Sequence, residues 1–270
     1  MTTPPPHPGV LTEADTCREY VTPRLVAAGW STEPHAIGEQ RSFTDGRIIV
    51  TGGRVRRGKQ RRADYILYYR RDYLLAIVEA KAVGLAVEAG VQQARESAEM
   101  LGLKFAYATN GQRIIEIDYL SGSEREVERF ATPAELWQRL RAAAQVPESG
   151  TAHLLEPFNL ISGKVPRYYQ QIAIHRVIEA ILLGETRILV TLATGTGKTC
   201  VAFQICWKLW NSRWNRTGEY RRPKILFLAD RNILVDDPMA KMFAPFGEAR
   251  HKISGGDVSK SRDLYFGIYQ

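Results

Sequence analysis

The chain has 270 residues, of which 44% are hydrophobic and 24% are charged, a composition typical of a folded globular protein and not of a disordered or fibrous one. Its length favours two domains over one. The formal net charge of +8 favours a polyanionic partner such as nucleic acid, with solubility through excess charge as the alternative.

The cysteines and the N-terminus bear on the compartment. Cys17, Cys200 and Cys206 have neither metal-ligand spacing nor the pattern of a disulfide framework, which indicates a reducing environment. The first residues, MTTPPPHPGV, lack the features of a signal peptide, and no apolar stretch reaches the length of a membrane span. We therefore expect a cytoplasmic protein without a membrane partner.

The first part of the chain predicts an α/β domain, residues 1–145, with a mixed sheet flanked by helices. In chain order, the expected elements are a helix over 12–29, strands over 47–51 and 64–70, a strand over 74–82, a helix over 85–101, strands over 105–109 and 113–119, and a helix over 133–144. Thr12 is a suitable cap for the first helix. The strand over 74–82 is apolar on both faces, which is typical of a central strand.

A Pro-, Gly- and Ser-containing stretch, residues 146–166, predicts a linker to a second domain, residues 167–270. That domain opens with a helix over 168–183 and continues with a strand over 187–192, a helix over 200–210 and a strand over 224–230. The order strand, helix, strand indicates a parallel sheet.

Residues 192–199 read LATGTGKT, between an apolar run and a helical segment, which is the context of a phosphate-binding loop. The residues expected to hold a nucleoside triphosphate are Thr194, Gly195, Thr196, Gly197, Lys198 and Thr199. Lys198 would reach the β- and γ-phosphates, and Thr199 would place its hydroxyl on Mg²⁺. Leu192 occupies the position of the usual first glycine, so the loop is of a relaxed form, and a chance Gly/Thr-rich turn is the alternative. We expect ATP as a cofactor.

A second group of polar residues lies in the segment RRADYILYYRRDYLLAIVEAKA, residues 61–82. If Arg71 and Asp72 form a two-residue turn, Asp64 lies opposite Glu79. Glu79 and Lys81 share one face of their strand because they are two residues apart. Opposed carboxylates repel unless a cation lies between them, so we expect Asp64 and Glu79 to bind Mg²⁺ for phosphodiester hydrolysis, assisted by Lys81. A surface ion pair is the alternative.

This segment resembles the PD-(D/E)xK nuclease motif, with Ala63 in place of the usual proline. Glu19 resembles the accessory acid that some of these nucleases carry in their first helix, and a solvated glutamate is the alternative. Gln93 resembles a glutamine that follows the catalytic lysine in helicase-attached nucleases, so it is a further catalytic candidate, although Ser97 replaces the usual tyrosine.

Together the two halves resemble the N-terminal part of the R subunit of type I restriction enzymes: a nuclease domain followed by an incomplete, P-loop (RecA-like) parallel α/β lobe of a superfamily 2 helicase. In the second half the resemblance lies in RYYQQIAIHRVIEA, LATGTGKT, ILFLADRNILVDDP and LYFGIYQ. It implies that Gln170 reads the adenine edge and that Arg231 and Asn232 contact the DNA backbone.

The basic loop 52–62 leads directly into Asp64, so Arg61 and Arg62 are further candidates for binding DNA, with a solvated loop as the alternative. The cluster Trp207, Trp210, Arg213, Trp214 and Arg216 presents two alternatives: stacking on DNA, or packing of two of its tryptophans in the core.

The function implied by the resemblance is an Mg²⁺-dependent DNA endonuclease joined to an ATP-dependent translocase lobe that restricts foreign DNA. The implied partners are double-stranded DNA and the methyltransferase and specificity subunits. The sequence contains no DExH-type motif, so we expect weak ATP binding and very slow hydrolysis by these residues alone. The alternatives are a helicase whose N-terminal domain only binds DNA, and a non-catalytic remnant.

Overall fold

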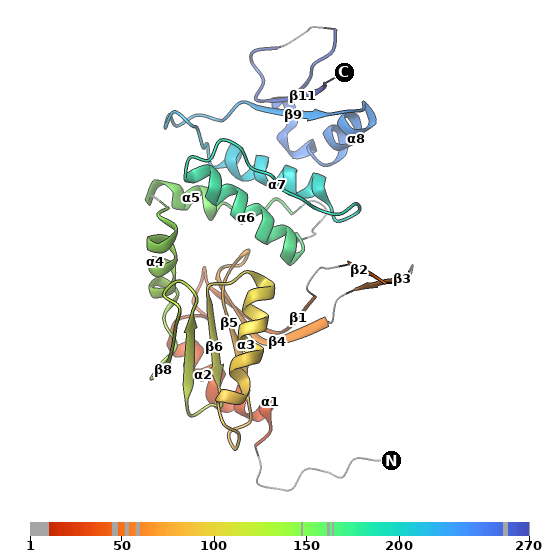
Figure 1. The fold of residues 1–270 in the computed structure, drawn as a ribbon. Helices are drawn as coiled ribbons and strands as arrows, with labels where there is room; N and C mark the ends of the chain where they lie inside the picture. Colours follow the sequence, from red (N-terminus) through yellow and green to blue (C-terminus); the bar gives the residue numbers. More distant parts are fainter. Residues whose placement is uncertain are drawn as a thin grey trace. The chain divides into compact units, whose positions relative to one another are not determined.

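The computed structural model describes residues 11–44, 48–51, 54–57, 60–146, 148–160, 163, 165–255 and 259–269, with the side chains of residues 44–60 outside this description. The chain divides into two compact units, Met1–Gln145 and Val146–Gln270. Figure 1 shows the elements of both units in chain order.

The first unit is built on a six-stranded mixed sheet with the order β1-β4-β5-β6-β7-β8 (Figure 1). Its strands are β1 (Ala36–Thr44), β4 (Gln60–Arg70), β5 (Tyr73–Ala80), β6 (Phe105–Thr109), β7 (Ile114–Asp118) and β8 (Ser123–Val127). β5 and β6 are parallel, and the other neighbouring pairs are antiparallel. All residues of β5 except Leu74 are buried, which confirms its prediction as a central strand.

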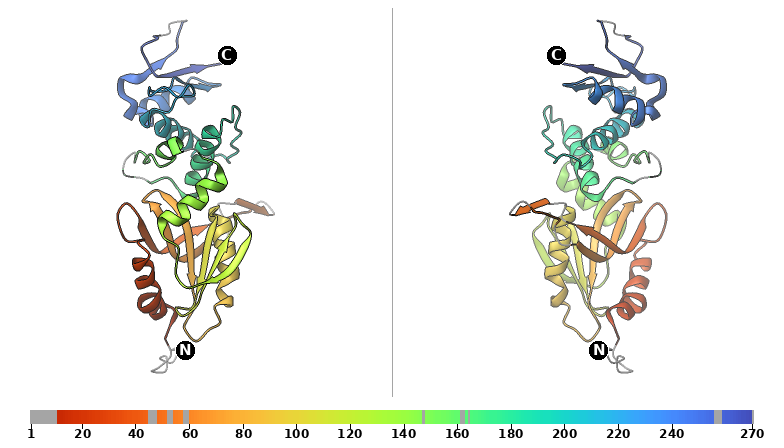
Figure 2. Two further views of the ribbon diagram at one scale, coloured as in Figure 1. Left: turned by 90° about the vertical axis from the view of Figure 1, so that its left-hand side faces the viewer. Right: turned by 90° about the vertical axis from the view of Figure 1, so that its right-hand side faces the viewer.

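Helices cover both faces of this sheet (Figure 2). On one face lies α3 (Glu88–Leu101), whose C-terminal residue is followed by Gly102 in the left-handed region at φ 66°. On the other face, α1 (Glu13–Thr16), a π-helical turn (Cys17–Val21) and α2 (Thr22–Ala27) form one continuous run. Thr12 caps this run as predicted, because its hydroxyl accepts from the Asp15 amide. α4 (Pro133–Ala144) ends the unit and has the predicted bounds.

The β4–β5 hairpin has the predicted register next to its carboxylates. Tyr65 pairs with Val78 and Ile66 with Ile77 in an antiparallel ladder. The next pair in this register is Asp64 with Glu79. Between these pairs and the turn the ladder is irregular, because Tyr68 pairs with Leu74 and register shifts lie on both sides of Tyr68. The register expected from a two-residue turn is restored where Leu67 pairs with Ala76.

Two parts of the first unit differ from the expected elements. The predicted basic loop over 52–62 instead includes β3 (Arg54–Arg57), which pairs with β2 (Ile48–Thr51) in a separate two-stranded sheet, and the first residues of β4. The edge strands β1 and β8 were not predicted. Both are rich in polar residues, as edge strands commonly are, and therefore lack the hydrophobic alternation of a half-buried strand.

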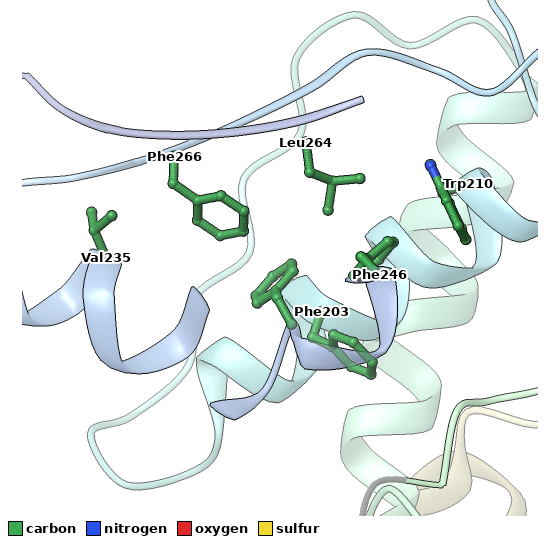
Figure 3. Close-up of a cluster of buried hydrophobic side chains, with 7 residues drawn as sticks. Phe203, Trp210, Val235, Phe246, Leu264 and Phe266 are labelled. Atoms are coloured by element: carbon green, nitrogen blue, oxygen red, sulfur yellow. The ribbon is translucent and has the colours of Figure 1, made fainter. Parts of the chain in front are cut away.

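The second unit contains helices α5 (Thr151–Leu154), α6 (Tyr168–Leu182), α7 (Lys198–Asn211) and α8 (Ile233–Lys241). Its sheet has the order β10-β11-β9, with β9 (Ile225–Ala229), β10 (Arg250–Lys252) and β11 (Leu264–Ile268) all parallel, as expected for the second domain. Figure 3 shows its aromatic core. The core consists of Phe203, Trp210, Val235, Phe243, Phe246, Leu264 and Phe266.

The predicted strand over 187–192 is absent. These residues have no regular structure, and the Leu189 side chain is 91% exposed. The described residues contain no strand that pairs with them, and an isolated extended segment has no hydrogen-bond partners for its backbone. An apolar run is therefore not sufficient to form a strand when no other strand of the described residues pairs with it.

The stretch over 146–166, expected to be a linker, is partly folded in the second unit. α5 and a short 3₁₀ turn (Glu148–Gly150) lie in it. The fully buried Lys208 of α7 donates hydrogen bonds from Nζ to the carbonyl oxygens of Leu154 and Glu156. This part of the stretch is therefore fixed to α7 by a buried cation.

Candidate functional site

Asp64 and Glu79 form a carboxylate pair at the end of the β4–β5 hairpin. Asp64 is 7% exposed and Glu79 is fully buried. The Asp64 Oδ2 atom accepts from the Ala80 amide at 2.8 Å, and Oδ1 accepts from Gln40 Nε2 at 3.1 Å. These two hydrogen bonds leave lone pairs on both oxygens for a further partner.

Gln40 of β1 directs its side chain to the site. In the β1–β4 ladder Glu39 pairs with Tyr65 and Arg41 with Ala63, so the register is continuous and Gln40 lies opposite Asp64. Its φ of 50° is unusual for a residue other than glycine. The Gln40 amide therefore contacts the Asp64 carboxylate directly across the two strands. The sequence does not reveal this role because β1 and its pairing with β4 were not predicted.

Glu79 is held by two donors from α3. Ser97 Oγ donates to Glu79 Oε1 at 2.8 Å, and Gln93 Nε2 donates to Glu79 Oε2 at 2.8 Å. Burial raises the pKa of Glu79 to about 7, and the Asp64 and Glu13 charges add to the increase, while the Ser97 hydrogen bond and the Lys81 charge oppose it. A buried carboxylate with a raised pKa gains from a bound cation.

Lys81 is connected to Glu79 through Gln93. The Lys81 ammonium donates to Gln93 Oε1 at 3.0 Å, and it lies 3.4 Å from Glu13 Oε2. The lysine side chain is only 17% exposed. The structure therefore brings together Asp64, Glu79, Lys81 and Gln93, all four predicted for this site.

The first helical run contributes Glu13 to this group, whereas Glu19 makes an ion pair with Arg18 at 3.4 Å. The Glu19 side chain is 45% exposed, in agreement with the alternative of a solvated glutamate. Ser97, noted only as a departure from the expected tyrosine, is a hydrogen-bond donor to Glu79. Spacing along the sequence does not indicate which helix residue faces a strand 60 or more positions away.

Arg61 and Arg62, predicted to bind DNA, lie on β4 opposite Phe43 and Ser42 of β1. Arg61 forms an ion pair with Glu96 of α3 and is therefore partly neutralised, whereas Arg62 is exposed. The side chains of the other basic residues of the predicted loop, Arg54, Arg56, Arg57 and Lys59, lie outside the described residues.

The phosphate-binding loop leads directly into α7. Gly195 and Gly197 have φ values of 78° and 86°, which only glycine adopts readily, and Gly197 is the N-cap of the helix. Thr194 is exposed and Thr199 half-buried in this loop. The Lys198 ammonium donates to the carbonyl oxygens of Leu192 at 3.2 Å and Ala193 at 3.3 Å, both acceptors within the loop itself. The loop thus presents a lysine and a helix N-terminus together, which suits a phosphate group.

Gln170 is 6% exposed and contacts this loop. Its Nε2 donates to the Thr196 carbonyl at 2.8 Å, and its Oε1 accepts from the Arg167 amide at 2.8 Å. Both ends of the amide that was expected to read adenine are therefore engaged within the chain. A Cβ atom at Gly197 would clash with Gln170 Nε2, so this contact also requires glycine there.

Arg231 and Asn232 follow the carboxyl end of β9, where α8 begins. The Arg231 side chain is 76% exposed, 3.8 Å from Asp230. Trp210 is buried in the core and Trp207 packs against it, which agrees with the packing alternative for two of the tryptophans.

Within the described part of the chain, no group of three or more His, Cys, Asp or Glu side chains is arranged to hold a metal. A metal at the hairpin would thus rely on Asp64 and Glu79. No helix among the described residues is both long and apolar enough to cross a membrane.

Comparison with known proteins gives consistent results for both units. Residues 163–270 match the family model "Type III restriction enzyme, res subunit". The chain is 38% identical over 271 aligned residues to the EcoAI type I restriction endonuclease subunit of Escherichia coli, covering 96% of this chain and 32% of that protein. It is 43% identical over 68 residues to the EcoKI endonuclease subunit of E. coli strain K12, covering 25% of this chain and 5% of that protein.

A solved structure supports the same relationship. It is described as a fragment of an HsdR subunit of a type I restriction enzyme from Vibrio vulnificus YJ016. The match has a TM-score of 0.85 and 54% identity, and it covers 97% of this chain and 47% of that one. The chain thus spans less than half of these relatives. Over nearly its whole length, it is a homologue of the endonuclease subunits of type I restriction enzymes.

Proposed function

We propose that this chain carries the nuclease site and the nucleotide-binding loop of a type I restriction endonuclease subunit. The observation that carries this proposal is the hairpin register, which makes Asp64 and Glu79 neighbours while Gln93 joins Glu79 to Lys81. The substrate is double-stranded DNA, and the partners are the methyltransferase and specificity subunits.

The two carboxylates fit Mg²⁺. This ion prefers oxygen ligands and retains several waters, so one or two carboxylates are sufficient to hold it. The fully buried Glu79 beside Asp64 provides a concentrated negative charge with little solvent to stabilise it. When bound, Mg²⁺ would supply charge stabilisation at a phosphodiester and lower the pKa of an attacking water.

The remaining residues have defined roles in this site. Asp64 is oriented by the Ala80 amide and by Gln40, so its free lone pairs have a fixed direction. Gln93 holds Lys81 Nζ close to Glu79, and Glu13 holds it from the other side. An ammonium group has three protons, so Lys81 retains a donor for a phosphate oxygen or a water.

The second unit would bind ATP through Thr194–Thr199, with Lys198 on the phosphates and Thr199 on Mg²⁺. Binding requires Lys198 to exchange its contacts with the Leu192 and Ala193 carbonyls for phosphate oxygens. We expect weak binding and very slow hydrolysis by this chain alone.

Isothermal titration of Mn²⁺ into the wild-type chain and the Glu79→Gln and Glu19→Gln variants tests the metal site. We expect one binding event in the wild type, its loss in Glu79→Gln, and no change in Glu19→Gln, because Glu19 is paired with Arg18 away from the pair. Equal binding by wild type and Glu79→Gln, or no binding by the wild type, would overturn the assignment.

A second variant separates metal binding from cleavage. Lys81→Met retains both carboxylates, so we expect it to bind Mn²⁺ and to bind DNA, while cleavage by the enzyme assembled with its partner subunits is lost. Cleavage retained by the assembled Lys81→Met enzyme would contradict the role given to Lys81. It would favour the alternative in which this N-terminal domain only binds DNA and another subunit cleaves it.

A further inference from the structure

The second unit has a basic hollow that is separate from the glycine-rich loop and from Arg231 and Asn232. It is an open cavity of about 540 Å³, lined by Arg213, Tyr220, Arg221, Arg222, Lys224 and Asp263. The lining residues come from the segment after α7, the residue before β9 and the residue before β11. Four of the six carry positive charge and one carries negative charge, so the hollow is suited to an anion.

The acidic groups at this hollow are already occupied. Asp263 accepts from Trp210 Nε1 at 3.0 Å and lies 3.2 Å from Lys224 Nζ. Glu219 forms an ion pair with Arg221. Among the described residues, neither Arg213 nor Arg222 has a carboxylate within ion-pair distance. Two guanidinium groups therefore remain for an external anion.

Both of these guanidinium groups are held by aromatic rings. The Arg222 Cζ atom lies 3.7 Å from the centre of the Trp210 ring, and the Arg213 Cζ atom lies 4.9 Å from the centre of the Tyr220 ring. Trp210 is in turn packed in the aromatic core (Figure 3). Its Nε1 also donates to Asp263. A stacked guanidinium keeps its edge N–H groups free, and its planar fork matches a phosphate.

Arg213 has a backbone conformation that is uncommon for a residue other than glycine. Arg213 has a φ of 56°, in the left-handed region that follows many helices and that glycine usually occupies. The conformation directs the chain after α7 so that Arg213 reaches Tyr220.

This hollow is distinct from the nucleotide loop and from Arg231 and Asn232. The nucleotide loop precedes Lys198 at the N-terminus of α7, whereas Arg213 follows the C-terminus of this 14-residue helix. At about 1.5 Å per residue, the two ends are roughly 20 Å apart. Arg222 precedes β9, whereas Arg231 and Asn232 follow it, at the opposite edge of the sheet.

We propose that this hollow binds a backbone phosphate of duplex DNA, with Arg213 and Arg222 as its ligands. Tyr220 is 80% exposed beside the two cations, as expected for a contact with a large partner. The formal charge of +8 and the homology with restriction endonuclease subunits favour DNA over an acidic protein segment. This site would add affinity without base recognition, because phosphate contacts carry no sequence information directly.

The test is binding of a fluorescent duplex to the chain, measured by anisotropy over a series of salt concentrations. We compare wild type, Arg222→Glu and Arg176→Glu, because Arg176 is an exposed arginine on α6 outside the hollow. We expect Arg222→Glu to weaken binding about fivefold or more and to reduce the salt slope by about 1, while Arg176→Glu has much smaller effects. Equal effects of the two variants would overturn the proposal.

Two further arms identify the ligand. Phenylglyoxal modification of the wild-type chain should be slowed at Arg213 and Arg222 by duplex DNA and unchanged at Arg176, a measurement that needs no variant to fold. Protection by inorganic phosphate or polyglutamate equal to that by DNA, at matched charge concentration, would overturn the assignment to a DNA backbone. Because the duplex is not cut in these assays, failure here leaves the Mn²⁺ test of the nuclease site unaffected.

Discussion

Replacement of Glu79 by glutamine tests whether the ionised Glu79 carboxylate destabilises the folded chain when no metal is bound. The pKa of Glu79 rises from 4.5 to about 7 on folding, chiefly through burial. Between these values the folded chain binds more protons than the unfolded chain, so stability falls as the pH rises. Integration of this difference gives a loss of roughly 2–3 kcal/mol between pH 5 and pH 8 in the wild type.

Glutamine has no charge to lose, so the Glu79→Gln variant should lack this part of the pH dependence. The new amide faces Gln93 Nε2, which donates to Glu79 in the wild type, so the variant also has a constant offset that does not depend on pH. The informative quantity is therefore the change with pH in the stability difference between the two chains.

The assay is urea denaturation of both chains at pH 5, 6, 7 and 8 in the presence of a chelator. We expect the variant to gain roughly 2–3 kcal/mol on the wild type from pH 5 to pH 8, and excess Mg²⁺ at pH 8 to reduce that gain. A stability difference that stays constant over this pH range would refute the reasoning.

Three other variants test contacts at the carboxylate pair, between α7 and the stretch before α6, and at the glycine-rich loop. Ser97→Ala removes a donor to the ionised Glu79 and should cost about 1.5 kcal/mol at pH 8 and less at pH 5, measured by the same denaturation; an equal loss at both pH values would contradict this role. Lys208→Met leaves the Leu154 and Glu156 carbonyls without their donor and should lower stability by about 2 kcal/mol or more in thermal unfolding. The exposed Lys241→Met is its control, with an expected effect below about 0.5 kcal/mol. Gln170→Ala should speed hydrogen exchange of the amides in residues 194–199, and unchanged exchange would show that the Thr196 contact does not order the loop.

The parts of the fold that rest on local patterns were predicted from the sequence. Next to Asp64 and Glu79 the β4–β5 register agrees with the count from a two-residue turn, although the ladder is irregular around Tyr68. The bounds of α4 follow from Thr132 and Glu135, which form a capping box, and from the proline that begins the helix. The phosphate-binding loop is recognisable because its glycines, lysine and threonine are adjacent in the chain. In each case the determining residues lie within a few positions of one another.

Edge strands and the segment over 187–192 depend on what lies beside them. β1 is a strand because β4 supplies its hydrogen bonds, although its own residues are largely polar. Residues 187–192 are apolar but have no pairing strand in the described chain, so they remain irregular and exposed. Pairing thus outweighs composition in deciding which segment becomes a strand.

The sequence by itself determined the two-part α/β organisation, the glycine-rich loop before α7 and the hairpin that carries Asp64, Glu79 and Lys81. Only the tertiary structure decided that Glu13 and not Glu19 approaches Lys81, that Ser97 and Gln40 hold the carboxylates, and that Arg213 and Arg222 share one hollow. The physical reason is range: turn, cap and loop chemistry acts between neighbours in the chain, whereas contacts between side chains on different elements depend on how those elements pack.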